Sequence, residues 1–213
     1  MPAARALLAS LTQVERRLFA RLDSPKKLQD YLERIPCNFE RGGETCKSAR
    51  QVLKTRTAHC IEGAFLAAAV LWYHGGRPLL LDLKANDFDV DHVVVPFRVR
   101  GLWGALSKTN HPMLRYRDPV YQSVRELAMS YFHEYIIEDG RKTLSSFSDL
   151  FDLRRQGTGW ITDPEPQWEV QFALDTSRHH SILRGRSRLM LRRADTIERR
   201  ALAMERWPER RAR

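Results

Sequence analysis

The chain has 213 residues, which is enough for one well-buried core with smaller additions at either end. Hydrophobic residues make up 43% of it, and no apolar run approaches the roughly 18 residues that a membrane-spanning helix needs. Charged side chains at Glu15 and Arg16 interrupt the apolar start of the chain before a signal peptide could form. We therefore expect no membrane span and a cytoplasmic location.

The positive charge of the chain is concentrated near its C terminus. The formal net charge is +10, and residues 176–213 hold twelve arginines against four acidic side chains, which accounts for +8 of it. Such a segment could contact RNA, DNA or an anionic lipid surface. It contains few aromatic residues and no recognisable nucleic-acid module, however, so nucleic acid is not the partner that we expect.

Three cysteines, Cys37, Cys46 and Cys60, make an odd number in a chain without a secretory signal. A disulfide framework is therefore not expected, and at least one thiol should be free. The spacings of nine and fourteen residues match no common zinc finger or zinc ribbon. We expect no metal site and no cofactor.

The first part of the chain has a helical pattern. Apolar residues at spacings of three and four predict an amphipathic helix over 4–22 and another over 24–35, which begins at the N-cap Ser24. A short helix should carry the apolar residues of 46–53. The next helix should run over 60–73 and end at a pair of glycines. Because this helix is almost wholly apolar, it must lie at the centre of the core.

From residue 79 the pattern changes to short apolar runs separated by turns. It predicts an antiparallel sheet with strands over 79–84, 92–99 and 102–108. Further helices are predicted over 119–135, which Pro119 opens, 146–154 and 187–207. The predicted fold class is α+β, with a central helix packed on the sheet and helical additions at both ends. We place the main domain at 1–140 and a basic, mostly helical extension, packing on or beside the core, at 141–213.

Two residues in this order of elements are suited to nucleophilic catalysis. Cys60 opens the central helix, where unpaired backbone N–H groups and the helix dipole favour a thiolate, and its own N–H lies where an oxyanion would form. His92 begins a strand, from which its imidazole can accept the thiol proton. Alone, each has an ordinary explanation, as a buried thiol in an apolar helix and as a hydrogen-bonded histidine at a strand end. Together they are a candidate nucleophile and base.

Four segments carry a resemblance to a known superfamily. They read TAHCIEGA at 57–64, LLLDL at 79–83, DHVVV at 91–95 and LWGAL at 102–106. Together they resemble bacterial members of the transglutaminase-like superfamily, over a match of 24–118, about half of the chain. The resemblance implies a papain-like core and thiol-dependent acyl transfer, with Cys60 as nucleophile and His92, 32 residues later, as base.

The chain departs from the superfamily at the residue that orients the histidine. The superfamily places an Asp just after the third strand, whereas 107–111 of this chain reads SKTNH and contains no carboxylate. An amide can also orient an imidazole, so we place Asn110 first in this role and Asp118 second. His59 is placed on the rim, because adjacent helical positions diverge by about 100 degrees. Trp103 is placed at the oxyanion side or rim, with a core position as its alternative.

Three functions remain open at this point. The first is a cysteine-dependent acyl-transfer enzyme, an amide or peptide hydrolase or a transglutaminase-like enzyme, whose partner is a substrate with an amide or peptide bond. The second is a catalytically inactive binding domain that keeps the fold, which the missing Asp motivates. The third is binding of nucleic acid or an anionic surface by the basic tail. The C-terminal segment is also a candidate lid over the cleft.

Overall fold

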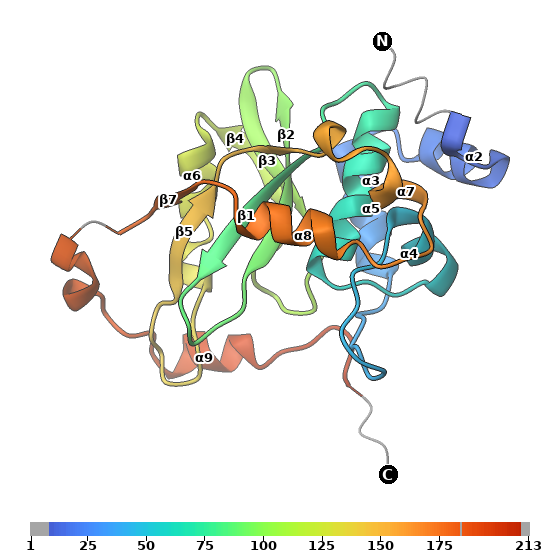
Figure 1. The fold of residues 1–213 in the computed structure, drawn as a ribbon. Helices are drawn as coiled ribbons and strands as arrows, with labels where there is room; N and C mark the ends of the chain where they lie inside the picture. The colour runs from blue at the N-terminus through green and yellow to red at the C-terminus, as the bar shows by residue number, and fades with distance from the viewer. Residues whose placement is uncertain (1–8, 184, 210–213) are drawn as a thin grey trace.

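The computed structural model describes residues 9–183 and 185–209 (Figure 1). Strands and helices are mixed, every strand pairing is antiparallel, and helices cover both faces of the sheet. The predicted α+β class is therefore confirmed. Across the sheet the strands follow the order β4-β3-β2-β1-β5-β7, and β6 pairs with the start of β1. Their bounds are β1 (Leu79–Ala85), β2 (His92–Val99), β3 (Leu102–Ser107), β4 (Arg117–Tyr121), β5 (Leu144–Ser148), β6 (Phe151–Asp152) and β7 (His179–Ser181).

The helices that precede the sheet are α2 (Gln13–Arg21), α3 (Pro25–Arg34), α4 (Ala49–Thr55) and α5 (Cys60–Tyr73). The last three begin close to the predicted positions, whereas the predicted helix over 4–22 is interrupted at Leu11 and Thr12, and the Thr12 side chain caps α2. The Ser24 side chain caps α3 as predicted, because its hydroxyl accepts a hydrogen bond from the Lys27 backbone N–H. The start of the first predicted helix, residues 4–8, lies outside the described residues.

One face of the sheet packs against α5, as the apolar sequence of this helix predicts. Eleven of its fourteen residues are buried. Leu80, Val93, Val95 and Phe97 point from β1 and β2 into the same core, which α3, α4 and α7 (Gly159–Thr162) complete. Figure 1 shows these helices gathered on one side of the strands. Hydrophobic burial over this interface fixes the position of the start of α5 relative to the sheet.

A second, smaller core lies on the opposite face. Side chains that alternate with those of the first core, among them Leu81, Leu83 and Val94, pack there against α6 (Val124–Met129) and the short helix η1 (Phe132–Glu134). Tyr135 is buried in this core and donates its hydroxyl to the Leu83 carbonyl at 2.8 Å. The sheet is thus covered on both faces.

Two predicted helices are strands over part of their length, and of the predicted helix over 119–135 only the part that holds α6 and η1 is helical. Pro119 does not open a helix, because it lies within β4, an edge strand, where a residue without an N–H is tolerated. The predicted helix over 146–154 is replaced by β5, β6 and the 3-10 helix η2 (Leu153–Gln156). Both of these strands pair with β1, more than 50 residues earlier in the chain, and this pairing overrides the local preference.

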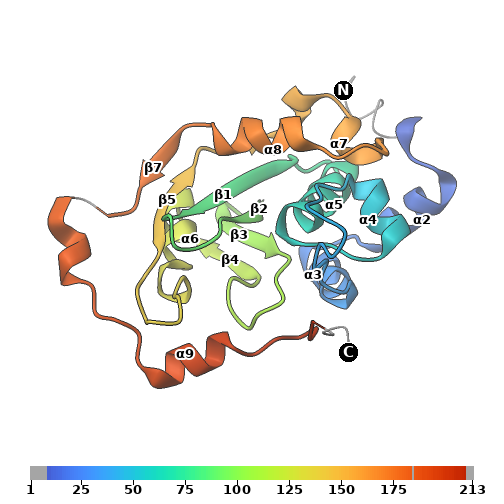
Figure 2. The ribbon, with the colours of Figure 1, turned by 60° about the horizontal axis from the view of Figure 1, so that its bottom comes forward.

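The segment after residue 140 completes the sheet as well as adding helices. It contributes β5, β6 and β7, together with α7, α8 (Trp168–Asp175), the 3-10 helix η3 (Gly185–Met190) and α9 (Thr196–Leu202). The predicted helix over 187–207 is divided between η3 and α9, and Arg184 and 210–213 of the basic tail lie outside the described residues. Figure 2 shows α9 and the chain beyond it running along the edge of the molecule toward α3. No helix in the described ranges is long and apolar enough to cross a membrane.

Candidate functional site

The start of α5 meets the start of β2 and the end of β3. Cys60 is the first residue of α5, so its backbone N–H belongs to the first helical turn and has no partner within the helix. Its side chain is partly exposed, and the thiol is free. This position combines access to solvent with the positive end of the helix dipole.

Two histidines lower the pKa of Cys60. Burial alone would raise the pKa of the thiol, but hydrogen bonds with His59 and His92, and the positive charge that these imidazoles carry when protonated, lower it to about 5. Burial would lower the pKa of His59, yet its hydrogen bond with Cys60, the thiolate charge and the Glu62 carboxylate raise it to about 9. Between these values the structure favours a thiolate beside an imidazolium.

His59 reaches the thiol because it is the N-cap residue and not part of the helix. Its backbone is extended, with φ −94° and ψ −170°, so the angular divergence of adjacent helical positions does not apply to it. The placement of His59 on the rim is therefore corrected. Its ring Nε2 donates to the Thr45 carbonyl at 2.9 Å.

A buried carboxylate holds His59 in place. Glu62 is fully buried, accepts a hydrogen bond from the His59 backbone N–H at 3.1 Å, and lies 3.4 Å from its ring Nε2. The same carboxylate accepts from the Thr45 hydroxyl at 2.7 Å and from the Lys47 backbone N–H at 3.0 Å, while Asn38 donates to it from the preceding loop. Because the carboxylate is bonded from several directions, it is a fixed negative charge beside His59.

His92 is oriented by a serine. Its Nε2 lies 2.8 Å from the hydroxyl oxygen of Ser107, at the end of β3. The Ser107 hydroxyl donates its only proton to the Leu114 carbonyl, so toward His92 it must act as acceptor. His92 therefore carries its proton on Nε2, and in the neutral ring the lone pair lies on Nδ1, the nitrogen available to the Cys60 thiol.

The backbone of Ser107 is fixed in turn by Gln29 on α3. The amide of Gln29 donates to the Ser107 carbonyl at 2.9 Å and accepts from the Ser107 N–H at 3.0 Å. Gln29, Ser107 and His92 are all buried. Sequence reasoning missed both Ser107 and Gln29. The only signal for Ser107 was its position at the start of the segment 107–111, where an Asp was expected.

The two residues predicted to orient His92 lie elsewhere. Asn110 forms paired hydrogen bonds with the backbone of Trp207, both at 2.9 Å. Asp118 lies on the edge strand β4, where it is exposed. Neither forms a hydrogen bond with His92, whose described partner on this side is Ser107.

Trp103 is also placed away from the thiol. It lies four residues before Ser107 on β3, which corresponds to about 13 Å along a strand. Its ring packs on the second core and under the Arg98 guanidinium, 5.4 Å from the ring centroid. The core alternative for Trp103 therefore agrees with the structure, and the rim placement does not.

Two pockets flank the site. One of about 710 Å³ opens beside His92 and is lined by Tyr135, by residues of the 134–141 loop and by α9. A second, of about 450 Å³, lies between Cys37 and Trp207. The chain after α9 contributes to both, so it passes over the region between them. The first volume suits a small molecule or part of a peptide.

The other two thiols differ from Cys60 in their surroundings. Burial raises the pKa of Cys46 to about 12, and burial also raises the pKa of Cys37. Both thiols are free. Only Cys60 of the three has an environment that favours the thiolate at neutral pH.

The fold and the site together define an α+β protein with a cysteine–histidine centre at a helix start. A scan of known family models and a search of curated proteins both found no match for the chain. The geometry of Cys60, His59, His92 and Ser107 is the feature of the molecule that points to a function.

Proposed function

We propose that the protein is a cysteine-dependent acyl-transfer enzyme that acts on an amide or peptide bond. The observation that carries the proposal is the placement of Cys60 at a helix start, between one imidazole that stabilises a thiolate and another whose tautomer is set by Ser107. An ordinary buried cysteine needs neither partner. The likeness of the sequence to the transglutaminase-like superfamily points to the same chemistry.

The reaction begins with transfer of the Cys60 thiol proton to Nδ1 of His92, while His59 stays protonated. The Cys60 sulfur then attacks the carbonyl carbon of the substrate, and the electron pair of the carbonyl moves to its oxygen, which the Cys60 backbone N–H can bind. When the carbon–nitrogen bond breaks, protonated His92 gives its proton from Nδ1 to the leaving amine. Water or an amine, deprotonated by His92, then attacks the thioester, and the thiol is restored.

The two imidazoles have different tasks in this scheme. His59, held by Glu62 and the Thr45 carbonyl, remains protonated and stabilises the thiolate. His92, held by the neutral Ser107 hydroxyl, can exchange its proton during each half of the reaction. A neutral third member in place of a carboxylate is thus compatible with catalysis, because a second histidine supplies the charge.

The proposal is tested by alkylation with iodoacetamide as a function of pH, read for each cysteine by mass spectrometry. Cys60 should react with an apparent pKa near 5, whereas Cys37 and Cys46 serve as internal controls and should stay unreactive at neutral pH. In His59→Gln and in His92→Ala the apparent pKa of Cys60 should rise, since each substitution removes a hydrogen bond to the sulfur.

The alternatives give different results in the same experiment. If Cys60 is as inert as Cys46 in the wild-type protein, the acyl-transfer proposal fails and a binding domain becomes the better explanation. Binding through the basic tail has less support, because arginines of the tail form pairs within the molecule, including Arg206 with Glu33 and Arg192 with Asp195.

A further inference from the structure

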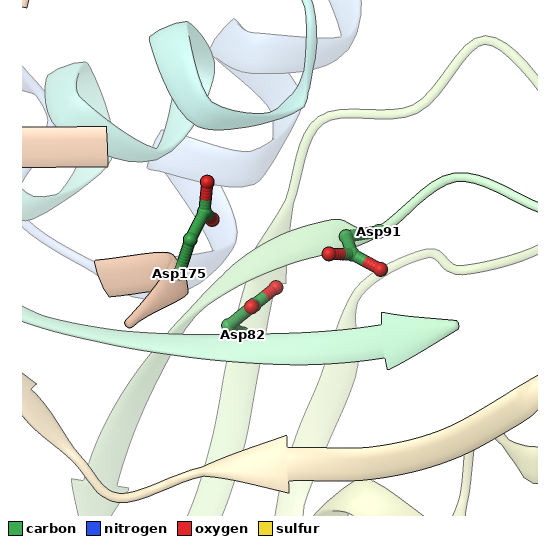
Figure 3. Close-up of side chains that lie close together, drawn as sticks. All are labelled: Asp82, Asp91 and Asp175. Atoms are coloured by element: carbon green, nitrogen blue, oxygen red, sulfur yellow. The ribbon is translucent and has the colours of Figure 1, made fainter. Parts of the chain in front are cut away.

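Three carboxylates from separate parts of the chain meet beside the sheet. Asp82 belongs to β1, Asp91 directly precedes β2, and Asp175 ends α8 (Figure 3). One oxygen of each lies within 4.8 Å of the corresponding oxygens of the other two. Like charges at this separation repel one another, so the arrangement needs a compensating positive charge.

Asp82 is the deepest member of the group and is incompletely bonded. The residue is fully buried, and its Oδ2 lies 3.1 Å from Nε2 of His179. Its Oδ1 is also buried and has no hydrogen-bond partner among the residues that the structure describes. Figure 3 shows this carboxylate rising from β1 into the space between Asp91 and Asp175. A buried carboxylate oxygen without a partner is costly, and it indicates a missing ligand.

The neighbouring cationic side chains do not contact all three carboxylates. Lys84 lies 3.2 Å from Oδ2 of Asp91, and the Ala85 backbone N–H donates to Oδ1 of the same carboxylate at 2.8 Å. Lys84 and His179 therefore each contact one aspartate, and neither reaches Oδ1 of Asp82.

We propose that Asp82, Asp91 and Asp175 bind a divalent cation, with Ca²⁺ as the ion that fits best. Carboxylate oxygens are the ligands that Ca²⁺ prefers, and its metal–oxygen distances of 2.3–2.6 Å allow oxygens up to about 5 Å apart around one ion. The spacing of 4.8 Å or less fits that limit without movement of the chain. Water completes the coordination, as it commonly does for this ion.

The site would connect two neighbouring strands to a helix that is distant in sequence. It joins β1 and the end of α8 to the residue before His92, and partly exposed Asp175 gives the ion a route from solvent. The inference does not depend on the proposed acyl transfer, since it rests on the carboxylate group alone.

The test is calorimetric titration of the full-length protein with CaCl₂ up to about 5 mM, together with thermal unfolding in Ca²⁺ and in EDTA. The wild type should bind one ion saturably and unfold at a higher temperature with Ca²⁺. In Asp175→Asn the affinity should fall about tenfold or more, because one charged ligand is lost. Asp149→Asn is the matched control, since Asp149 is an exposed aspartate that pairs with His180 outside the group, and it should bind as the wild type does.

Two results would overturn the inference. One is the absence of saturable Ca²⁺ binding to the wild type, and the other is equal affinity in the wild type and Asp175→Asn. Lys84→Met shows why a negative result arises. If this variant binds Ca²⁺ and the wild type does not, the lysine ammonium neutralises the carboxylates in place of a metal ion, and the wild type has no metal site. Neither readout involves Cys60, so failure here leaves the acyl-transfer proposal untouched.

Discussion

The position of the proton on His92 depends on one hydroxyl group. Ser107 can accept from Nε2 of His92 only because its own proton goes to the Leu114 carbonyl. A carboxylate in this position has no proton and would always accept, whereas a serine hydroxyl accepts from His92 only while its own proton is bound by the Leu114 carbonyl. The Gln29 amide, which holds the Ser107 backbone on both sides, preserves the geometry.

Removal of this hydroxyl should therefore disturb His92 and not only the packing. In Ser107→Ala the buried Nε2–H loses its acceptor, which should cost about 1–3 kcal/mol of folding stability and allow the ring to change its tautomer. The ¹⁵N chemical shifts of His92 report the tautomer, and alkylation of Cys60 near pH 6 should slow. Ser107→Thr retains the hydroxyl and should restore both. Unchanged ¹⁵N shifts in Ser107→Ala would exclude the orienting role.

At this scale the sequence predicted the two central residues and missed their supports. Cys60 and His92 were found because a helix start and a strand start can be read from local patterns. His59 was misplaced because its direction depends on the extended backbone of an N-cap. Ser107 depends on Gln29, 78 residues earlier, and contacts of that length leave no local pattern.

At the scale of the elements, α5 packs so closely against the end of β3 that residue 63 of this helix must be glycine. A Cβ atom at Gly63 would lie 2.5 Å from Cβ and 2.8 Å from Cγ of Lys108, the residue after Ser107. Real Cβ contacts are longer than this, and the Cβ of Lys108 cannot rotate away. The close approach sets the distance between the thiol on α5 and the histidine's partner on β3.

Gly63→Ala should destabilise the protein even though alanine is the better helix former. The gain in helix propensity is up to about 1 kcal/mol, whereas overpacking typically costs about 1–3 kcal/mol. Urea unfolding should show a lower midpoint. Gly42→Ala is the control, since a Cβ there meets nothing within 4 Å, and it should not lower the midpoint. A midpoint for Gly63→Ala at or above that of the wild type would contradict the prediction, because it would mean that α5 can shift away from Lys108 without cost.

The elements themselves were predictable where the pattern was local. The predicted helix over 60–73 has the bounds of α5, and the three predicted strands match β1, β2 and β3 within a residue or two. The ends of β4 and β5 fell within predicted helices, because a strand at or near a sheet edge is defined by its partner rather than by its own sequence. The sheet thus extends beyond the predicted main domain.

On the scale of the whole molecule, the C-terminal segment, which is the chain that follows α9, passes over the region beside the thiol. Its backbone is bound to Asn110 at Arg206 and Trp207, and the Arg206 guanidinium pairs with Glu33 on α3 at 2.9 Å. Within the described part of the chain, the buried indole N–H of Trp207 has no hydrogen-bond partner, which weakens the docked state. Mostly exposed residues and an unpaired buried donor are features of a segment that can detach at low cost.

Detachment of this segment should expose the thiol. Arg206→Glu places a like charge opposite Glu33, and a stop codon after Ala203 removes the segment while α9 remains. In both variants Cys60 should be alkylated faster at pH 7 than in the wild type, with its apparent pKa unchanged, because access changes and the two histidines do not. Arg200→Glu makes the same charge change on α9 and should react at the wild-type rate. If all four proteins react alike, the segment does not act as a lid, and the pocket beside His92 is the route by which substrate reaches Cys60.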